Sequence, residues 1–302
     1  MSNKTQISAT IPLPDHFRPS DFFALHQRDS EQIAEKVEQN TLYKGLYWAN
    51  LPACLSVYLT PKEAQIELNI DGTLPDKNPQ YLINTVKKML GLWQPIEQFE
   101  SKFSSHPQIG QLVTKNSGLR VPQTATPFEA LCWAIIGQQI SVAVVTSIRR
   151  KFIQLASEQH SNGLWCFPGA QQISVLTEEQ LLQIGCSHNK ARTLISVSQQ
   201  ITDKQIDLDI QVDECNLEQM QNQLLSIKGI GQWTVNYVLL RGYGWLDGSL
   251  HGDVAVRRNI QTLLGRTDKI SAEEAQLWLQ EYSPWRALVA AHLWAQQSAA
   301  GY

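Results

Sequence analysis

Two glycines separated by a single apolar residue, Gly229-Ile230-Gly231, lie between two segments that each have helical periodicity. Glycine has no Cβ and reaches backbone conformations that other residues avoid, so the chain can reverse direction here within a few residues. We therefore predict two antiparallel helices joined by a hairpin with no room for side chains at Gly229 and Gly231. The first turn of the second helix would present backbone N–H groups that lack intrahelical partners, which is a ready site for a phosphate.

The charges around this hairpin favour an anion. No Asp or Glu occurs from residue 219 to residue 246, whereas Lys228 and Arg241 do. A plain helical hairpin remains the alternative interpretation of one Gly-x-Gly pair, and Thr234 after it favours phosphate binding. The whole chain carries 25 Lys and Arg against 28 Asp and Glu. This balance excludes a protein that coats nucleic acid by charge alone, but it allows a local basic groove.

The first third of the chain predicts an α+β domain, an antiparallel sheet with helices, over residues 1–96. Residues 65–70 alternate polar and apolar side chains, as a half-buried strand does. Residues 1 to about 20 contain three prolines and are expected to form an extended lead-in. The expected elements are strands at 45–48, 55–59 and 65–70, and helices at about 30–38 and 78–90.

Residues 97–302 predict an all-α region, because helical periodicity replaces strand patterns from about Pro95 onward. The clearest helix start is at Thr126, an N-cap residue followed by Pro127 at the first helical position. Glu129 stands three residues after Thr126, which completes the pattern of a capping box. Further helices are expected after residue 141 and at 178–184, 188–201, 216–226, 232–241, 254–264, 272–281 and 284–298.

Asp253 stands where one of these helices begins, directly after Gly252. Aspartate is a common N-cap, because its carboxylate accepts a backbone N–H of the first turn. The same N–H groups and the positive end of the helix dipole also favour a negative charge at that position. The residues alone leave both roles open, a structural cap and the charged group of a site.

The hairpin Gly-Ile-Gly-Gln-Trp-Thr, followed at this interval by Gly-Asp-Val, resembles the helix–hairpin–helix, Gly/Pro-Asp superfamily of DNA base-excision glycosylases. The likeness covers nearly the whole chain and is strongest to the DNA-3-methyladenine glycosylase II branch. Six landmarks in matching order are more specific than any one of them. They are Phe128–Ala143, Cys166–Pro168, Lys190–Arg192, Gly229–Tyr237, Asp253 and Pro284–Trp294.

The resemblance implies two helical subdomains with an active-site cleft between them and Asp253 as the catalytic residue. A fixed carboxylate beside the sugar stabilises the positive charge that develops when the glycosidic bond breaks, and it can orient or deprotonate water. The resemblance places Trp233, Tyr237 and Trp294 in the substrate pocket, where a cationic alkylated base is attracted to aromatic faces. Core packing is the alternative role for these three side chains.

Two features point to a monofunctional enzyme, which removes the base and leaves an abasic site without cutting the strand. Bifunctional members carry a lysine nucleophile where this chain has Trp233. The last cysteine, Cys215, precedes the hairpin, so we expect no iron–sulfur cluster and no other cofactor. The resemblance implies one structural monovalent cation, held at the hairpin by the backbone carbonyls of Leu225, Ile227 and Ile230.

The expected partner is double-stranded DNA that contains alkylated bases. Members of the superfamily insert a side chain into the gap left by the flipped nucleotide. The branch that this chain resembles most has leucine where Gln139 stands, so the residues leave open whether Gln139 or Ile140 is the wedge, or whether a polar plug fills the gap. The expected DNA-binding residues are Gln138, Gln139, Ile140, Lys228, Gly229, Gly231 and Thr234.

Two other functions stay open on the sequence. One is a monofunctional glycosylase for deaminated or mismatched bases, and the other is a non-catalytic DNA-binding module that uses only the hairpin. The aromatic set argues against the module, which would not need a base pocket. The N-terminus lacks the apolar stretch of a secretory signal, and no run of about 18 apolar residues occurs. We therefore expect a cytoplasmic monomer that acts on chromosomal DNA.

Overall fold

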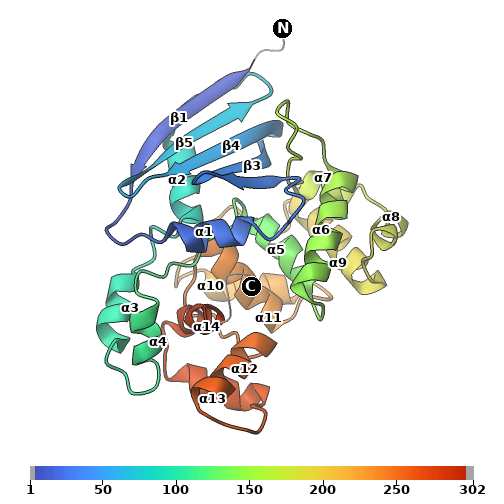
Figure 1. The fold of residues 1–302 in the computed structure, drawn as a ribbon. Helices are drawn as coiled ribbons and strands as arrows, with labels where there is room; N and C mark the ends of the chain where they lie inside the picture. Colours follow the sequence, from blue (N-terminus) through green and yellow to red (C-terminus); the bar gives the residue numbers. More distant parts are fainter. Residues whose placement is uncertain (1–3, 297–302) are drawn as a thin grey trace.

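The computed structural model of the protein describes residues 4–296, and Figure 1 shows a sheet lying over a group of helices. The sheet has five strands in the order β1-β5-β4-β3-β2, and all neighbours are antiparallel. Two helices, α1 (Pro19–His26) and α2 (Gln80–Met89), belong to this N-terminal part. The strands are β1 (Thr5–Pro12), β2 (Glu35–Glu38), β3 (Thr41–Trp48), β4 (Leu51–Leu59) and β5 (Glu63–Ile70).

The three expected strands lie within β3, β4 and β5, and the expected helix at 78–90 contains α2. Two local expectations are wrong. The lead-in contains β1, which buries Ile7 and Ile11 and pairs along its length with β5. The helix expected at 30–38 is absent, because Glu35–Glu38 forms β2 and pairs with β3.

Helices follow the sheet domain, and the predicted fold class, an α+β N-terminal domain followed by an all-α region, is confirmed. None of the helices in residues 4–296 is both long and apolar enough to cross a membrane. The helices are α3 (Ile96–Phe103), α4 (Gly110–Lys115), α5 (Pro127–Gly137), α6 (Val142–Ala156), α7 (Ala170–Ser174), α8 (Glu178–Gln183), α9 (His188–Thr202), α10 (Leu217–Leu225), α11 (Gln232–Val238), the π-helical turn η1 (Leu239–Tyr243), α12 (Val254–Leu263), α13 (Ala272–Gln280) and α14 (Arg286–Trp294).

Helix α5 begins where the sequence predicts, but only half of the capping box forms. The Thr126 hydroxyl accepts the backbone N–H of Glu129 at 3.2 Å. The Glu129 carboxylate lies in a buried group of charges instead, where Lys44 Nζ donates to it at 2.7 Å. The Glu129 carboxylate therefore pairs with the buried Lys44 instead of accepting a backbone N–H at the start of α5.

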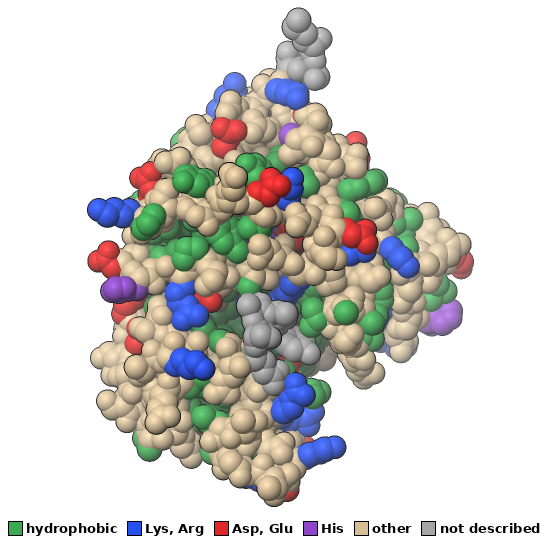
Figure 2. All heavy atoms as spheres, viewed as in Figure 1, with side chains coloured by type: hydrophobic (Ala, Val, Ile, Leu, Met, Phe, Trp, Pro, Cys, Tyr) green, Lys and Arg blue, Asp and Glu red, His purple; other side chains and the backbone are tan. Residues whose placement is uncertain are grey.

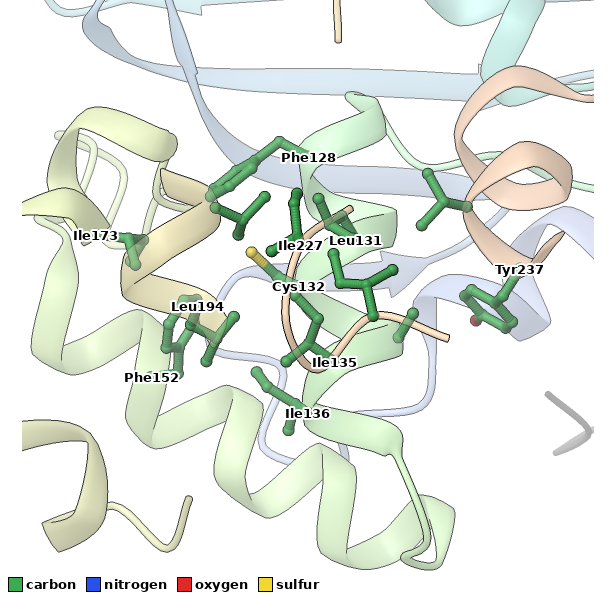
Figure 3. Packing of buried hydrophobic residues seen from close by; sticks show 14 of the residues in the cluster. Phe128, Leu131, Cys132, Ile135, Ile136, Phe152, Ile173, Leu194, Ile227 and Tyr237 are labelled. Carbon is green, nitrogen blue, oxygen red and sulfur yellow. The ribbon is translucent and has the colours of Figure 1, made fainter. Parts of the chain in front are cut away.

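The helical region is built around two hydrophobic cores. The first core is formed by helices between α5 and η1, and Figure 3 shows Leu131, Phe152, Leu194 and Ile227 pointing into it from different segments. The second core joins α3 and α4 to the helices from α12 to α14. Trp233, in the first turn of α11, packs against both cores. The start of α11 therefore lies at the seam between two helical units.

The second helical core contains helices that come earlier in the sequence than those of the first core. The core beneath the sheet ends at Leu90, and the second helical core takes up Ile96 and the residues after it. Residues 127–239 then form the first helical core, and the chain returns to the second one at Leu240. The domain boundary between residues 96 and 97 stays a prediction.

Candidate active site

The two hairpin glycines differ in their surroundings. Gly229 has a φ of +96°, and a Cβ there would lie 2.1 Å from the Thr193 hydroxyl oxygen, so no side chain fits. At Gly231 the expectation of crowding is wrong, since φ is −109° and a Cβ would meet nothing within 4 Å. Gly231 is the exposed N-cap of α11. Its missing side chain leaves the first N–H groups of that helix open to a ligand.

The hairpin is held in place by two neighbouring segments. The Thr193 hydroxyl on α9 donates to the Lys228 carbonyl at 3.0 Å, while the Lys228 side chain stays exposed. The Gln138 amide donates to the Gly229 carbonyl at 2.9 Å and to the Thr234 hydroxyl at 3.0 Å. Gln138 thus ties the loop between α5 and α6 to the hairpin, and Thr234 is buried beneath it.

The loop between α5 and α6 presents one side chain at its tip. Gln139 is exposed and has a φ of +59°, in the left-handed region that residues with a Cβ seldom occupy. Ile140 is half-buried and packs against the first helical core. Of the two wedge candidates, Gln139 is therefore the one that projects from the protein.

Asp253 is buried and is held by three N–H donors. It caps α12, because its Oδ1 accepts the Val256 backbone N–H at 2.9 Å. The indole Nε1 of Trp233 donates to Oδ2 at 3.2 Å, and that of Trp294 donates to Oδ1 at 3.3 Å. Only 5 % of Asp253 is exposed, and none of the ion pairs within residues 4–296 includes it. Among the described residues, N–H dipoles and not an ion pair therefore orient the carboxylate.

The aromatic side chains expected in the pocket gather around this carboxylate. The rings of Trp233 and Tyr237 lie 5.4 Å apart, centroid to centroid, at an angle of 32°. Tyr237 and Trp294 are almost fully buried, while Trp233 is half-buried. The structure thus brings Asp253 and all three aromatic residues into one contiguous group.

Two cavities adjoin this group. Trp294 lines one of about 250 Å³, and Tyr237 lines a smaller one of about 20 Å³. Leu25 and Arg28, at the end of α1, line both cavities. In the described part of the chain, the N-terminal domain therefore supplies a wall of the candidate site, which the sequence analysis missed. Asp253 lines neither cavity.

Comparisons with known proteins identify the family of this chain. Residues 132–284 match the family described as HhH-GPD superfamily base excision DNA repair protein. The chain belongs to the HhH-GPD superfamily. Residues 17–126 of this HhH-GPD protein match the AlkA N-terminal domain, a range that contains α1, α2 and the strands β2 to β5.

Some relatives of this HhH-GPD protein are similar over most of its length. A DNA-3-methyladenine glycosylase of Bacillus subtilis is 22% identical over 94% of this chain and 95% of that protein. Among solved structures, the 3-methyladenine DNA-glycosylase from Archaeoglobus fulgidus has a TM-score of 0.77 at 19% identity, covering 94% of this chain and 96% of that one. Clostridium acetobutylicum 8-oxoguanine glycosylase/lyase in complex with double-stranded DNA has a TM-score of 0.72 at 14% identity, covering 97% and 95%. At these identities the structures share the fold, and they do not select a base.

Arg241 lies beneath the candidate site of this HhH-GPD protein rather than on its surface. Its guanidinium donates to the Pro122 carbonyl at 2.9 Å and lies 5.8 Å from the centroid of the Trp294 ring. Burial lowers the pKa of Arg241 to about 10, although the nearby Tyr237 opposes this shift. The side chain stays protonated at neutral pH, so it adds positive charge next to Trp294.

A group of five buried charged or titratable side chains joins the sheet domain to α5 and α6. Lys44 Nζ lies 2.6 Å from a Glu35 oxygen and 2.7 Å from a Glu129 oxygen. Arg149 lies 2.9 Å from Glu129 and 3.1 Å from Glu35, and His26 Nδ1 lies 2.7 Å from Glu35. We call these residues the interdomain charge cluster. It borders the small cavity at Tyr237, so it supports the wall of the site.

The cation implied at the hairpin would have backbone carbonyls as its ligands. The Ile227 carbonyl accepts the Ile230 N–H at 3.0 Å, and a carbonyl oxygen has a second lone pair for a cation. Such a donor set fits a monovalent ion, and the three carbonyls of Leu225, Ile227 and Ile230 stay a prediction. Within residues 4–296, no group of three or more His, Cys, Asp and Glu side chains could hold a metal.

Proposed function

We propose that this chain is a monofunctional DNA glycosylase that flips an alkylated purine, such as 3-methyladenine, out of duplex DNA and hydrolyses its N-glycosidic bond. The observation that carries the proposal is the buried Asp253 carboxylate, oriented by the indoles of Trp233 and Trp294. The name of the distant relative in Bacillus subtilis, DNA-3-methyladenine glycosylase, supports the substrate class. The product is an abasic site in an uncut strand.

Asp253 would act on the sugar and on water. Positive charge grows on the sugar as the bond to the base breaks, and a preoriented carboxylate stabilises that charge in a site from which water is largely excluded. The same carboxylate can orient or deprotonate the attacking water. Trp233 occupies the position of the lysine that forms a Schiff base in bifunctional members, and it hydrogen-bonds to Asp253 instead.

The aromatic group would hold the flipped base. Trp294 faces a cavity of about 250 Å³, which leaves space beside the indole for a planar ring. A cation over an aromatic face gains about 0.5 to 1 kcal/mol at an exposed site and about 2 kcal/mol or more when it is desolvated. Positive charge makes an alkylated purine a good leaving group, so Asp253 acts mainly on the charge that develops on the sugar and not on the departing base.

A second candidate is a monofunctional glycosylase for deaminated or mismatched bases, which are neutral. The cavity beside Trp294 is lined by Arg28 and Arg241 and also by the carboxylate of Asp21, so its lining does not select between a cationic and a neutral base. The substrate test below separates the two candidates.

Duplex DNA would be held by the hairpin and the neighbouring loop. The exposed start of α11 at Gly231 and the exposed Lys228 offer N–H dipoles and a charge to a phosphate. Gln139 is exposed at the tip of the neighbouring loop, which Gln138 ties to the hairpin. The face in Figure 2 carries Lys and Arg side chains over its lower, helical half, which suits a polyanion.

The substrate is tested with duplex oligonucleotides that carry one lesion each, assayed for released base. We expect release from duplexes with 3-methyladenine or 7-methylguanine. We also expect that borohydride added during the reaction traps no protein–DNA adduct, because no lysine stands at position 233. Release of hypoxanthine without release of methylated bases would favour the second candidate, and a trapped adduct would place the chain in the bifunctional class.

The phosphate contact at the hairpin is tested by Lys228→Gln. Binding of duplex DNA should weaken to a similar extent for all sequences, and the slope of log K against log salt should become shallower by about 0.9. Lys36→Gln is the matched control, because Lys36 lies on β2 of the sheet domain, in an ion pair with Glu38. Equal salt slopes for the two variants and the unchanged protein would contradict the role assigned to Lys228.

A further inference from the structure

A third cavity, of about 720 Å³, lies away from the candidate active site. It is bordered by α2, by residues 93–98, by the segment 208–214 and by the end of η1. It shares no lining residue with the cavities beside Trp294 and Tyr237. We call it the rear cavity.

The rear cavity lies at the opposite ends of the two helices that carry the expected DNA contacts. Helix α5 starts at the cavity with Pro127 and ends at Gly137, next to Gln138, while α11 follows its N-cap Gly231 and continues through η1 to Tyr243 on the cavity wall. At 1.5 Å per residue, these paths are roughly 16 to 18 Å long. An occupant of the rear cavity would therefore not compete with DNA for the hairpin.

The cavity has aromatic walls, and two of its rings are unusually exposed. Tyr81 and Trp93 are 68 % and 60 % exposed, whereas Trp285 is buried. Tyr243 donates its hydroxyl to the Leu208 carbonyl at 2.8 Å, which fixes the 208–214 segment at the cavity edge. A concave, largely apolar site of this volume with exposed aromatic rings is typical of a ligand or partner site.

The charges at the edge of the cavity select the occupant. The loop between α9 and α10 carries five exposed acidic residues against one lysine, and two of the five line the cavity. They are Asp203, Asp207, Asp209, Asp213 and Glu214, with Lys204 as the lysine. This edge repels nucleic acid and attracts cations.

The other charged groups of the rear cavity offset only part of this edge. Burial lowers the pKa of Lys88 to about 8, although Asp209 opposes this shift, so Lys88 stays mostly protonated at neutral pH and offsets the charge of Asp209. Asp247 forms an ion pair with Arg286 at 2.8 Å, so these two charges cancel locally. Glu214 on the cavity wall and the other exposed acids of the same loop, Asp203, Asp207 and Asp213, keep the edge acidic against the single Lys204.

We propose that the rear cavity docks a basic segment of a partner protein. An apolar or aromatic side chain of that segment enters the cavity between the aromatic walls, and the flanking Lys or Arg side chains lie against the acidic loop 203–214. Rings such as Trp93 favour both kinds of contact, because they bury apolar surface and attract cations to their faces. The partner and the DNA can be bound at the same time, since they contact opposite ends of α5 and α11.

The test uses two fluorescein-labelled peptides, one with the sequence Lys-Leu-Lys-Phe-Lys and one with Glu in place of each Lys, titrated with the full-length protein. We expect the basic peptide to bind about tenfold more tightly than the acidic one, and Trp93→Ala to weaken it by about tenfold. Leu277→Ala is the control, because Leu277 is equally exposed, on α13, and does not line the cavity. A saturating DNA duplex should leave the affinity for the basic peptide unchanged.

Each other outcome overturns the proposal in a defined way. Equal binding of the two peptides would remove the role of the acidic loop, and failure of both to bind would show that the cavity is not a basic-segment site. Displacement of the peptide by the duplex, or weaker duplex binding by Trp93→Ala, would assign the cavity to nucleic acid. Because Trp93 is 60 % exposed, its replacement should leave the thermal unfolding midpoint unchanged.

Discussion

Asp253→Asn is expected to reduce the rate of base release from alkylated duplex DNA by about 10² to 10³-fold or more, while duplex binding stays largely intact. The amide oxygen of Asn can still accept the Val256 N–H, so the cap of α12 survives. The negative charge beside the sugar is lost. In addition, the amide nitrogen cannot accept a hydrogen bond from an indole, so one of the contacts to Trp233 and Trp294 breaks.

The measurement is single-turnover release of methylated base, with thermal unfolding recorded for each variant. Ser271→Ala is the control for a lost helix cap, because the Ser271 hydroxyl accepts the Glu274 N–H at the start of α13. That variant should lose about 1 kcal/mol of stability and keep its activity. Undiminished release by Asp253→Asn would restrict Asp253 to the role of a cap and would remove the basis of the proposed mechanism.

The second large effect is expected in the interdomain charge cluster. Lys44→Met should lower the free energy of unfolding by about 3 to 5 kcal/mol, because it leaves the buried carboxylates of Glu35 and Glu129 without one of their two shared cations. Urea denaturation measures this change. Lys36→Met is the control, since the Lys36–Glu38 pair lies on the surface and is expected to contribute less than about 1 kcal/mol.

The same cluster predicts a dependence of stability on pH. Burial alone raises the pKa of Glu35, but Arg149 and Lys44 outweigh burial and hold that pKa well below its usual value of 4.5. The contribution of Glu35 to stability is therefore fully present above about pH 4.5 and is lost as the pH falls through the lowered pKa of the folded state. Lys44→Met should flatten this part of the stability curve. An equal loss of stability in the Lys36 and Lys44 variants would show that the cluster contributes little.

The elements that depend mainly on residues next to each other in the chain were predicted correctly from the sequence. The alternation in residues 65–70 and the Thr126-Pro127 helix start are set by neighbours along the chain, and both elements formed. Strands β1 and β2 depend on partners that local patterns do not show. β1 pairs with β5, more than fifty residues later, and β2 is a four-residue segment with three charged side chains. Its Glu35 is buried only because Lys44 and Arg149 neutralise it.

The candidate site was predictable only where a motif marked it. Asp253, Trp233 and Tyr237 lie close to the hairpin in sequence, so their grouping follows from the motif. The wall formed by Leu25 and Arg28 depends on how the N-terminal domain docks, which no spacing in the sequence encodes. The two glycines look alike in the sequence, yet only Gly229 is crowded, because Thr193 of α9 lies against it.

The two indoles that hold Asp253 come from different parts of the helical region, since Trp233 packs on both cores and Trp294 belongs to the second. The orientation of the Asp253 carboxylate therefore depends on how the two helical units pack against each other. A small slip between those units would misdirect the carboxylate without removing any atom from it. Substitutions in either helical core, far from the DNA, can therefore abolish catalytic turnover while the protein stays folded.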